Sequence, residues 1–167
     1  MGKENLTEWL RGHAEEVLAE IGIKKSQTVL DFGCGSGLYA IPAAQLVGEE
    51  GKVYALDKNE EALKAVLENA KKSGLRNVKT IYSDTLKTGL DDEAVDVVLL
   101  YDVVHLIEDR TTLFSEIRRI LKSEGVVSIY PMHVKMDEIK EQMQESGFSL
   151  RDEKYEGNIL NFVNVRS

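Results

Sequence analysis

Val29-Leu-Asp-Phe-Gly-Cys-Gly-Ser-Gly37 is the stretch that decides the fold. An apolar run enters a loop with three alternating glycines, and an apolar helical pattern follows it. Glycine lets a main chain turn tightly and lets a ligand approach the backbone closely. A dinucleotide-binding loop would have its third glycine at position 38, which is Leu38, and a phosphate-binding P-loop would have Gly-Lys-Ser/Thr, which is absent. The stretch therefore predicts a strand, a ligand-binding loop and a helix, but neither of these phosphate-binding loops.

Outward from this stretch, short β-branched runs alternate with amphipathic stretches, a pattern typical of βαβ units. We expect helices over 4–21, 37–47, 59–73, 109–122 and 135–146, and strands over 28–32, 52–56, 78–82, 95–101 and 125–130. The tail predicts a hairpin of two further strands, 148–155 and 159–166. The predicted fold class is α/β: a doubly wound, Rossmann-like seven-stranded sheet, mostly parallel, with a C-terminal antiparallel hairpin and helices on both faces.

Length, charge and cysteine content limit the class of protein. The 167 residues suit a single domain, with 1–22 as an N-terminal capping helix and 28–167 as its core. The net charge of −8 argues against a nucleic-acid or anionic-membrane binder held by bulk charge. The single Cys34 excludes a disulfide scaffold and a Cys-rich zinc site. The sequence has no membrane-spanning apolar run and no signal-peptide core, so we expect a cytoplasmic location.

Acidic residues follow the strands beside the glycine loop. Asp57 ends the second strand, 20 residues after Gly37, where a carboxylate can accept hydrogen bonds from both hydroxyls of a ribose. Asp84 follows the third strand, where a carboxylate can accept from an exocyclic amine such as that of adenine. Asp31 adds a carboxylate inside the glycine motif. Several acids without converging Lys or Arg suit a positively charged nucleoside that lacks phosphates.

These motifs, together with the strand Val-Asp-Val-Val-Leu-Leu-Tyr101, resemble the ordered motifs of class I S-adenosylmethionine-dependent methyltransferases, in particular the ubiquinone/menaquinone-biosynthesis-like group. The resemblance covers about 28–132, and the terminal hairpin completes the seven-stranded sheet of that family. It implies an enzyme of class EC 2.1.1.- that uses S-adenosylmethionine, releases S-adenosylhomocysteine and needs no metal. Most of the rate would come from placing the acceptor in line with the methyl group.

The resemblance also implies roles for individual residues. The three glycines of the loop would pass under the methionine part of the cofactor, Asp57 would hold the ribose, and Asp84 would face the adenine amine. Cys34 is expected to be a small buried residue rather than a nucleophile, because no histidine lies near it in the motif. The expected cofactor-binding residues are Asp31, Gly33, Cys34, Gly35, Gly37, Asp57, Lys58, Asp84, Thr85 and Tyr101.

Two residues after the fourth strand are candidate catalytic residues. His105 could act as a general base near neutral pH, and Asp102 could orient the acceptor. Each also has a structural interpretation, as a histidine bonded to backbone and as the cap of the next segment. The related group often has two adjacent histidines after this strand, and only the first is present here. His133, after the fifth strand, is a candidate for lining the pocket.

Three functions remain open: a methyltransferase for a small-molecule acceptor, which we favour, a methyltransferase-fold enzyme acting on protein or RNA with a partner, and a non-catalytic nucleoside-binding module. The segments 102–109 and 131–135 are short where family members often have an insertion that covers the substrate. The acceptor site could therefore be open, or covered by a second subunit in a homodimer or with another protein. Residues 1–21 could also form a lid, with Trp9 and His13 facing the site.

Overall fold

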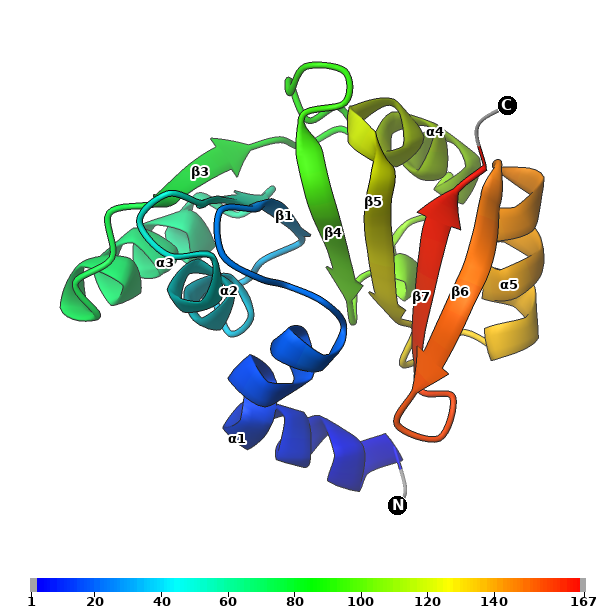
Figure 1. The fold of residues 1–167 in the computed structure, drawn as a ribbon, viewed down its shortest axis with the longest axis horizontal. Coiled ribbons are helices and arrows are strands. Elements are labelled where there is room, and N and C mark those ends of the chain that lie inside the picture. Colours follow the sequence, from blue (N-terminus) through cyan, green and yellow to red (C-terminus); the bar gives the residue numbers. More distant parts are fainter. Residues whose placement is uncertain (1–2, 166–167) are drawn as a thin grey trace. The chain divides into compact units, whose positions relative to one another are not determined.

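The computed structural model in Figure 1 describes residues 3–165 of the chain. The chain divides into two compact units, Met1–Tyr82 and Ser83–Ser167, which we call the N-terminal and the C-terminal unit. The described residues form seven strands, the number predicted from the sequence. None of the helices in the described part of the chain is both long enough and apolar enough to span a bilayer.

The N-terminal unit is a three-stranded parallel sheet with strand order β3-β2-β1. Helices α2 and α3 pack against the strands and against each other. Because all three strands are parallel, their carboxyl ends lie at one edge of the sheet, so the segments that follow them are close together. Its elements are α1 (Lys3–Glu20), β1 (Thr28–Phe32), α2 (Ala40–Val47), β2 (Lys52–Asp57), α3 (Glu60–Lys72) and β3 (Val78–Tyr82).

Helix α1 has a kink that the sequence did not predict. His13 has non-helical backbone angles (φ −131°, ψ 22°), and its Nδ1 lies 2.8 Å from the carbonyl oxygen of Trp9. The two rings stack with their centroids 4.4 Å apart. On either side of the kink the predicted apolar stripe is buried, as at Leu10 and Val17. Trp9 and His13 thus pack on each other within α1, and a lid role for residues 1–21 stays a prediction.

The C-terminal unit is a four-stranded sheet with strand order β4-β5-β7-β6. Strands β4 and β5 are parallel, and β6 and β7 form the predicted antiparallel hairpin, with β7 beside β5. Helix α5 packs alongside β6 (Figure 1). Its elements are β4 (Val95–Tyr101), the 3₁₀ turn η1 (Val104–Leu106), α4 (Arg110–Ile120), β5 (Leu121–Tyr130), α5 (Met136–Glu145), β6 (Phe148–Lys154) and β7 (Ile159–Asn164).

Three local predictions differ from the structure. Helix α2 begins at Ala40 rather than at 37, because Gly37 has a positive φ of 99° that a helix cannot accommodate. Strand β5 begins at Leu121 rather than at 125, because Leu121 pairs with Val95 of β4 and its side chain is buried. The turn η1 was not predicted, since three residues are too few to show a helical period.

Candidate functional site

The glycine loop of the N-terminal unit is tied to the end of β2 through its backbone. The N–H groups of Gly33 and Cys34 both donate to the carbonyl of Leu56, at 2.8 and 2.9 Å. The N–H of Gly35 donates to Oδ2 of Asp57 at 2.9 Å. Gly35 has a φ of 53°, and a Cβ placed on it would meet no atom within 4 Å. The loop therefore has a fixed backbone with open space beside it, which lets a ligand approach the main chain.

The carboxylate of Asp57 is held in place by two backbone donors. Oδ2 accepts from Gly35, and Oδ1 accepts from the N–H of Asn59 at 3.0 Å. Each carboxylate oxygen can accept more than one hydrogen bond, so both oxygens can still receive ligand hydroxyls. The side chain of Asn59 in turn accepts from the N–H groups of Glu61 and Ala62 and caps α3. The capping of α3 thus fixes the segment that carries Asp57, beside the exposed Lys58.

Asp31 is the least satisfied group beside the loop. It is 2% exposed, and its Oδ2 has no hydrogen-bond partner. Burial, followed by the charge of Asp57, raises the pKa of Asp31 to about 7. A cation beside it would relieve both effects, because it would stabilise the charged carboxylate that burial disfavours.

Cys34 is buried, as predicted, and is not set up as a nucleophile. Burial, followed by the negative charges of Asp31 and Asp57, raises the pKa of its thiol. The thiol is thus neutral at physiological pH, and only the thiolate is an effective nucleophile.

The C-terminal unit carries the other predicted cofactor-binding residues. Asp84 and Thr85 are exposed in a loop that the hydroxyl of Ser83 closes by donating to the carbonyl of Lys87 at 2.8 Å. Tyr101, by contrast, is buried, and its hydroxyl lies 2.8 Å from that of Ser128. The Tyr101 hydroxyl is therefore engaged inside this unit, and its role in cofactor binding stays a prediction.

Asp102, His105 and His133 come together at one edge of the C-terminal unit, and we call them the 102–105–133 cluster. Tyr101 and Tyr130 are opposite each other in the parallel pair β4–β5, so the segments after these two strands start side by side. Oδ1 of Asp102 lies 3.7 Å from Nδ1 of His105 and 3.8 Å from Nε2 of His133. The two imidazole rings meet edge to face, with centroids 4.5 Å apart. The sequence predicted each residue separately, but not that the three form one group.

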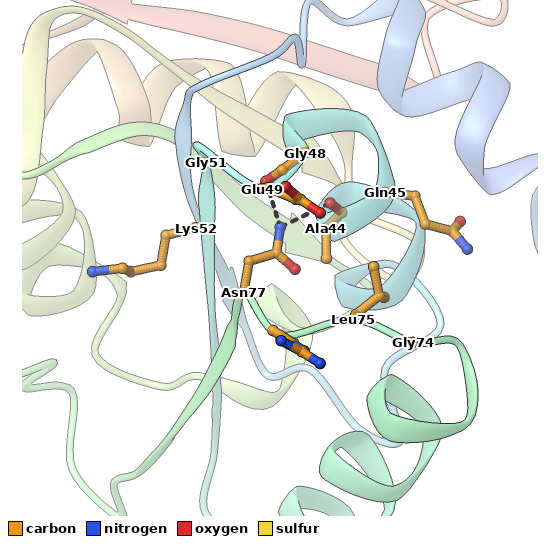
Figure 2. A pocket seen from close by; sticks show the side chains of 10 residues that line it. Ala44, Gln45, Gly48, Glu49, Gly51, Lys52, Gly74, Leu75 and Asn77 are labelled. Atoms are coloured by element: carbon orange, nitrogen blue, oxygen red, sulfur yellow. Dashed lines mark hydrogen bonds between the residues drawn. The ribbon is translucent and has the colours of Figure 1, made fainter.

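A cleft of about 810 Å³ lies at the other end of the N-terminal unit's strands, beside the start of β2 and the residues before β3 (Figure 2). Inside it, the side-chain amide of Asn77 donates to the carbonyls of Ala44 and Gly48, at 2.9 and 2.8 Å (Figure 2). These carbonyls also accept from the backbone N–H groups of Gly48 and Gly51, so Asn77 adds a second donor to each and ties the residues before β3 to the end of α2. Ligands of open α/β sheets bind at the carboxyl ends of the strands, so we interpret this cleft as structural.

A family profile described as a methyltransferase domain matches residues 23–163. Among curated proteins, the demethylmenaquinone methyltransferase of Geobacillus stearothermophilus is 32% identical over 112 residues, which are 67% of this chain and 48% of that protein. The corresponding protein of Staphylococcus aureus strain MRSA252 is 28% identical over 113 residues, 68% of this chain and 46% of that protein. The chain thus spans about half the length of these relatives.

The fold matches that of solved structures over nearly the whole chain. A SAM-dependent methyltransferase from Aquifex aeolicus has a TM-score of 0.84 at 24% identity, covering 99% of this chain and 100% of that one. At this identity the likeness concerns the fold, and it confirms the predicted Rossmann-like, mostly parallel seven-stranded class with its antiparallel hairpin.

Proposed function

The chain belongs to the methyltransferase-domain family, whose profile spans residues 23–163, and on that premise we propose that it transfers a methyl group from S-adenosylmethionine to a small-molecule acceptor. The observation that carries the proposal is the pairing of a fixed glycine loop with two carboxylates, Asp31 and Asp57, at the ends of neighbouring strands. The family profile extends over both compact units, which supports the proposal that they form one methyltransferase domain, residues 1–167. We also propose a cytoplasmic location.

The residues of the N-terminal unit fit this cofactor in shape and in charge. The open space beside Gly35 suits a ligand lying against the main chain. The half-buried Asp57 offers two fixed oxygens to ribose hydroxyls. The unpartnered oxygen of Asp31 suits a cationic ligand, since burial leaves this carboxyl without a compensating charge. The proposed cofactor-binding residues are Asp31, Gly33, Cys34, Gly35, Gly37, Asp57, Lys58, Asp84, Thr85 and Tyr101.

When bound, S-adenosylmethionine supplies an electrophilic methyl carbon on a positively charged sulfur. The acceptor atom would donate a lone pair or π electrons to the methyl carbon, and the sulfur–methyl bond would break with its electron pair passing to the sulfur, which becomes neutral. The acceptor must also release a proton, from an O–H, an N–H or a ring C–H. We assign this proton release to the 102–105–133 cluster, with His105 and Asp102 as the proposed catalytic residues. Positioning of the acceptor would supply most of the rate, as in other reactions that hold two reactants in line.

A reduced quinone-type ring is the first acceptor to test. The relatives from Geobacillus and Staphylococcus are named demethylmenaquinone methyltransferases, and a ring hydroxyl or ring carbon in such a molecule has a lone pair or π electrons to donate to the methyl group. Acceptors of other classes should be screened together with the quinone-type compounds. These classes include protein and RNA, which the enzyme would methylate together with a partner subunit that covers its acceptor site.

Calorimetric titration tests the cofactor assignment without knowledge of the acceptor. The protein is titrated with S-adenosylmethionine, with S-adenosylhomocysteine and, as a control, with NAD. We expect one site per chain for the first two ligands and none for NAD. Binding of NAD, or of none of the three, would overturn the proposed function.

A further inference from the structure

The 102–105–133 cluster combines two imidazoles and one carboxylate, which are side chains that ligate transition metals. We propose that it is a binding site for one divalent transition metal ion of the zinc type, with open coordination positions. The resemblance to methyltransferases implied a reaction without a metal, and no short motif of the sequence contains the three candidate ligands together. They follow different strands and become neighbours only because β4 and β5 are paired.

The distances in the cluster fit ligands of a common ion better than they fit hydrogen bonds. The two separations from Oδ1 of Asp102, 3.7 and 3.8 Å, exceed the length of an ordinary hydrogen bond, about 2.7–3.2 Å. Metal–ligand bonds of about 2.0–2.2 Å place two ligands of one ion about 3–4 Å apart. One candidate ligand atom from each of the three residues lies within 4.8 Å of the others. Small side-chain movements would therefore bring all three to bonding distance of one ion.

The cluster has both a free ligand atom and a route to solvent. Nδ1 of His105 is buried and has no hydrogen-bond partner, although buried polar atoms are normally satisfied. The side chains of Asp102 and His133 are 45% and 57% exposed, so an ion can reach them from solvent. An ion bonded to Nδ1 would satisfy this buried nitrogen, the atom of the cluster that has no hydrogen-bond partner.

The backbone around the cluster is held by bonds outside it. The N–H of Asp102 donates to the carbonyl of Tyr130 at 3.0 Å, which ties the ends of β4 and β5 together. Nε of Arg110 donates to the carbonyl of Val104 at 3.0 Å and so fixes η1, the turn that carries His105. The positive charge of Arg110 is paired with Glu138 at 3.1 Å. The turn is therefore positioned before an ion binds, as effective metal sites require.

The donor set selects the class of ion. Imidazole suits zinc, copper, nickel and iron, whereas magnesium and calcium take oxygen ligands almost exclusively. Three protein ligands also leave one or more positions open, as in catalytic rather than structural zinc sites. We therefore expect Zn²⁺ and Co²⁺ to bind and Mg²⁺ to be excluded.

The role of the ion rests on the proposed function, although its binding does not. An oxygen atom of an acceptor that enters an open position would lose its proton more readily, because a bound metal lowers the pKa of its oxygen ligands. His105 and Asp102 would then serve the acceptor as ligands of the ion. The site would favour acceptors that present an oxygen, and the cluster would be inactive after removal of the metal.

Titration with Co²⁺ tests the site directly. The protein of 167 residues, without an affinity tag, is freed of metal with a chelator and titrated with Co²⁺, and binding is followed by calorimetry and by the visible absorption of the bound ion. We expect one Co²⁺ per chain, displaced by Zn²⁺ and unaffected by excess Mg²⁺. His133→Ala and Asp102→Asn should each weaken binding by more than about tenfold, because even indirect changes around metal sites cost about 10–100-fold.

His13 provides the matched control. The chain has three histidines, and His13, in α1 of the other unit, is the one outside the cluster. His13→Gln should leave Co²⁺ affinity unchanged. Equal affinity in the wild type, His133→Ala and Asp102→Asn would overturn the proposal, and so would loss of binding in His13→Gln. Because His133 is exposed, its variant should fold, and far-UV circular dichroism checks this.

The same samples separate this proposal from the proposed function. Titration of the metal-free protein with S-adenosylmethionine reports on the cofactor site alone. Metal binding without cofactor binding would overturn the proposed function and leave the metal site standing. Cofactor binding without metal binding would overturn the metal site and leave the proposed function standing.

Discussion

The glycine loop and the 102–105–133 cluster are built in opposite ways. The loop is one continuous stretch, its backbone is fixed by the N–H bonds of Gly33, Cys34 and Gly35, and it buries a carboxyl, Asp31, at a cost. The cluster takes its residues from two separate segments and leaves two of its three side chains exposed. A site encoded in a contiguous motif can be recognised in the sequence. A site assembled by strand pairing becomes visible only in the fold.

The largest expected effects are on cofactor affinity for a variant of the glycine-loop region and on turnover for a variant of the cluster. Asp57→Ala should weaken S-adenosylmethionine binding by about 1–3 kcal/mol, roughly 5–150-fold, because it removes a charged acceptor that two backbone N–H groups hold in place. His105→Ala should leave that affinity within about threefold and instead lower turnover once an acceptor is known, by about 10²-fold if it takes part in proton transfer. Calorimetry measures the affinity, and methyl transfer measures the turnover.

Asp91→Ala is the control for the loss of an acidic residue, since Asp91 is exposed and outside both regions. Unchanged cofactor affinity in Asp57→Ala would refute the ribose assignment. A His105→Ala variant that lost cofactor affinity as strongly as Asp57→Ala would remove the distinction between the two regions.

The fold was predictable from the sequence wherever a pattern is local. The alternation of β-branched runs with amphipathic stretches predicted seven strands, and the structure has them. The glycine motif and Asp57 were predictable as neighbours, because parallel strands bring their carboxyl ends to one edge. The contact between His105 and His133 could not be predicted in the same way. It depends on the register of β4 against β5, which places Tyr101 opposite Tyr130. The kink at His13 also depends on a local hydrogen bond that no periodicity reveals.

A second prediction concerns a network that belongs to neither region. Glu116 accepts from both the N–H and the hydroxyl of Thr88, each at 2.8 Å, and from Arg119, also at 2.8 Å. Arg119 in turn binds Asp92. The acidic run at 91–93 is thus tied to α4 through Asp92. Glu116→Gln should lower the free energy of unfolding by about 1–2 kcal/mol. The affinity for S-adenosylmethionine should stay unchanged, because Glu116 lies outside both regions.

The pKa of Glu116 gives this prediction a pH dependence. The hydrogen bond from Arg119, aided by those from Thr88, lowers the pKa of Glu116 to about 2, below its ordinary value of 4.5. A carboxyl with a lowered pKa contributes stability above its unfolded pKa and loses it as the pH falls toward its folded pKa. The difference between wild type and Glu116→Gln in denaturant unfolding should therefore shrink between about pH 4.5 and 2. A difference that stays constant over this range would show that the charge of Glu116 is not what holds the loop.

The smallest expected effect tests whether the glycine loop is less stable without its ligand. The pKa of Asp31 is about 7, above its ordinary 3.8, because the carboxyl is buried and lies beside Asp57. Between these two pH values the folded protein holds a proton that the unfolded chain has released, so the Asp31 contribution to stability falls as the pH rises from about 4 to 7. Asp31→Asn should therefore raise the melting temperature of the ligand-free protein by a few degrees at pH 8 and by almost nothing at pH 4, as scanning calorimetry would measure.

Asp31→Asn should at the same time weaken S-adenosylmethionine binding, because the amide carries no charge to set against a cationic ligand. In the wild type that affinity should rise as the pH passes through about 7, where Asp31 becomes charged, and in the variant this rise should be absent. Stabilisation that is equal at pH 4 and pH 8 would mean that the titration of Asp31 has no part in it. Stabilisation at pH 8 combined with weaker binding would show that the buried carboxyl lowers the stability of the ligand-free fold and serves the ligand. In the 102–105–133 cluster the acidic side chain, Asp102, is exposed, so its charge is not buried in this way.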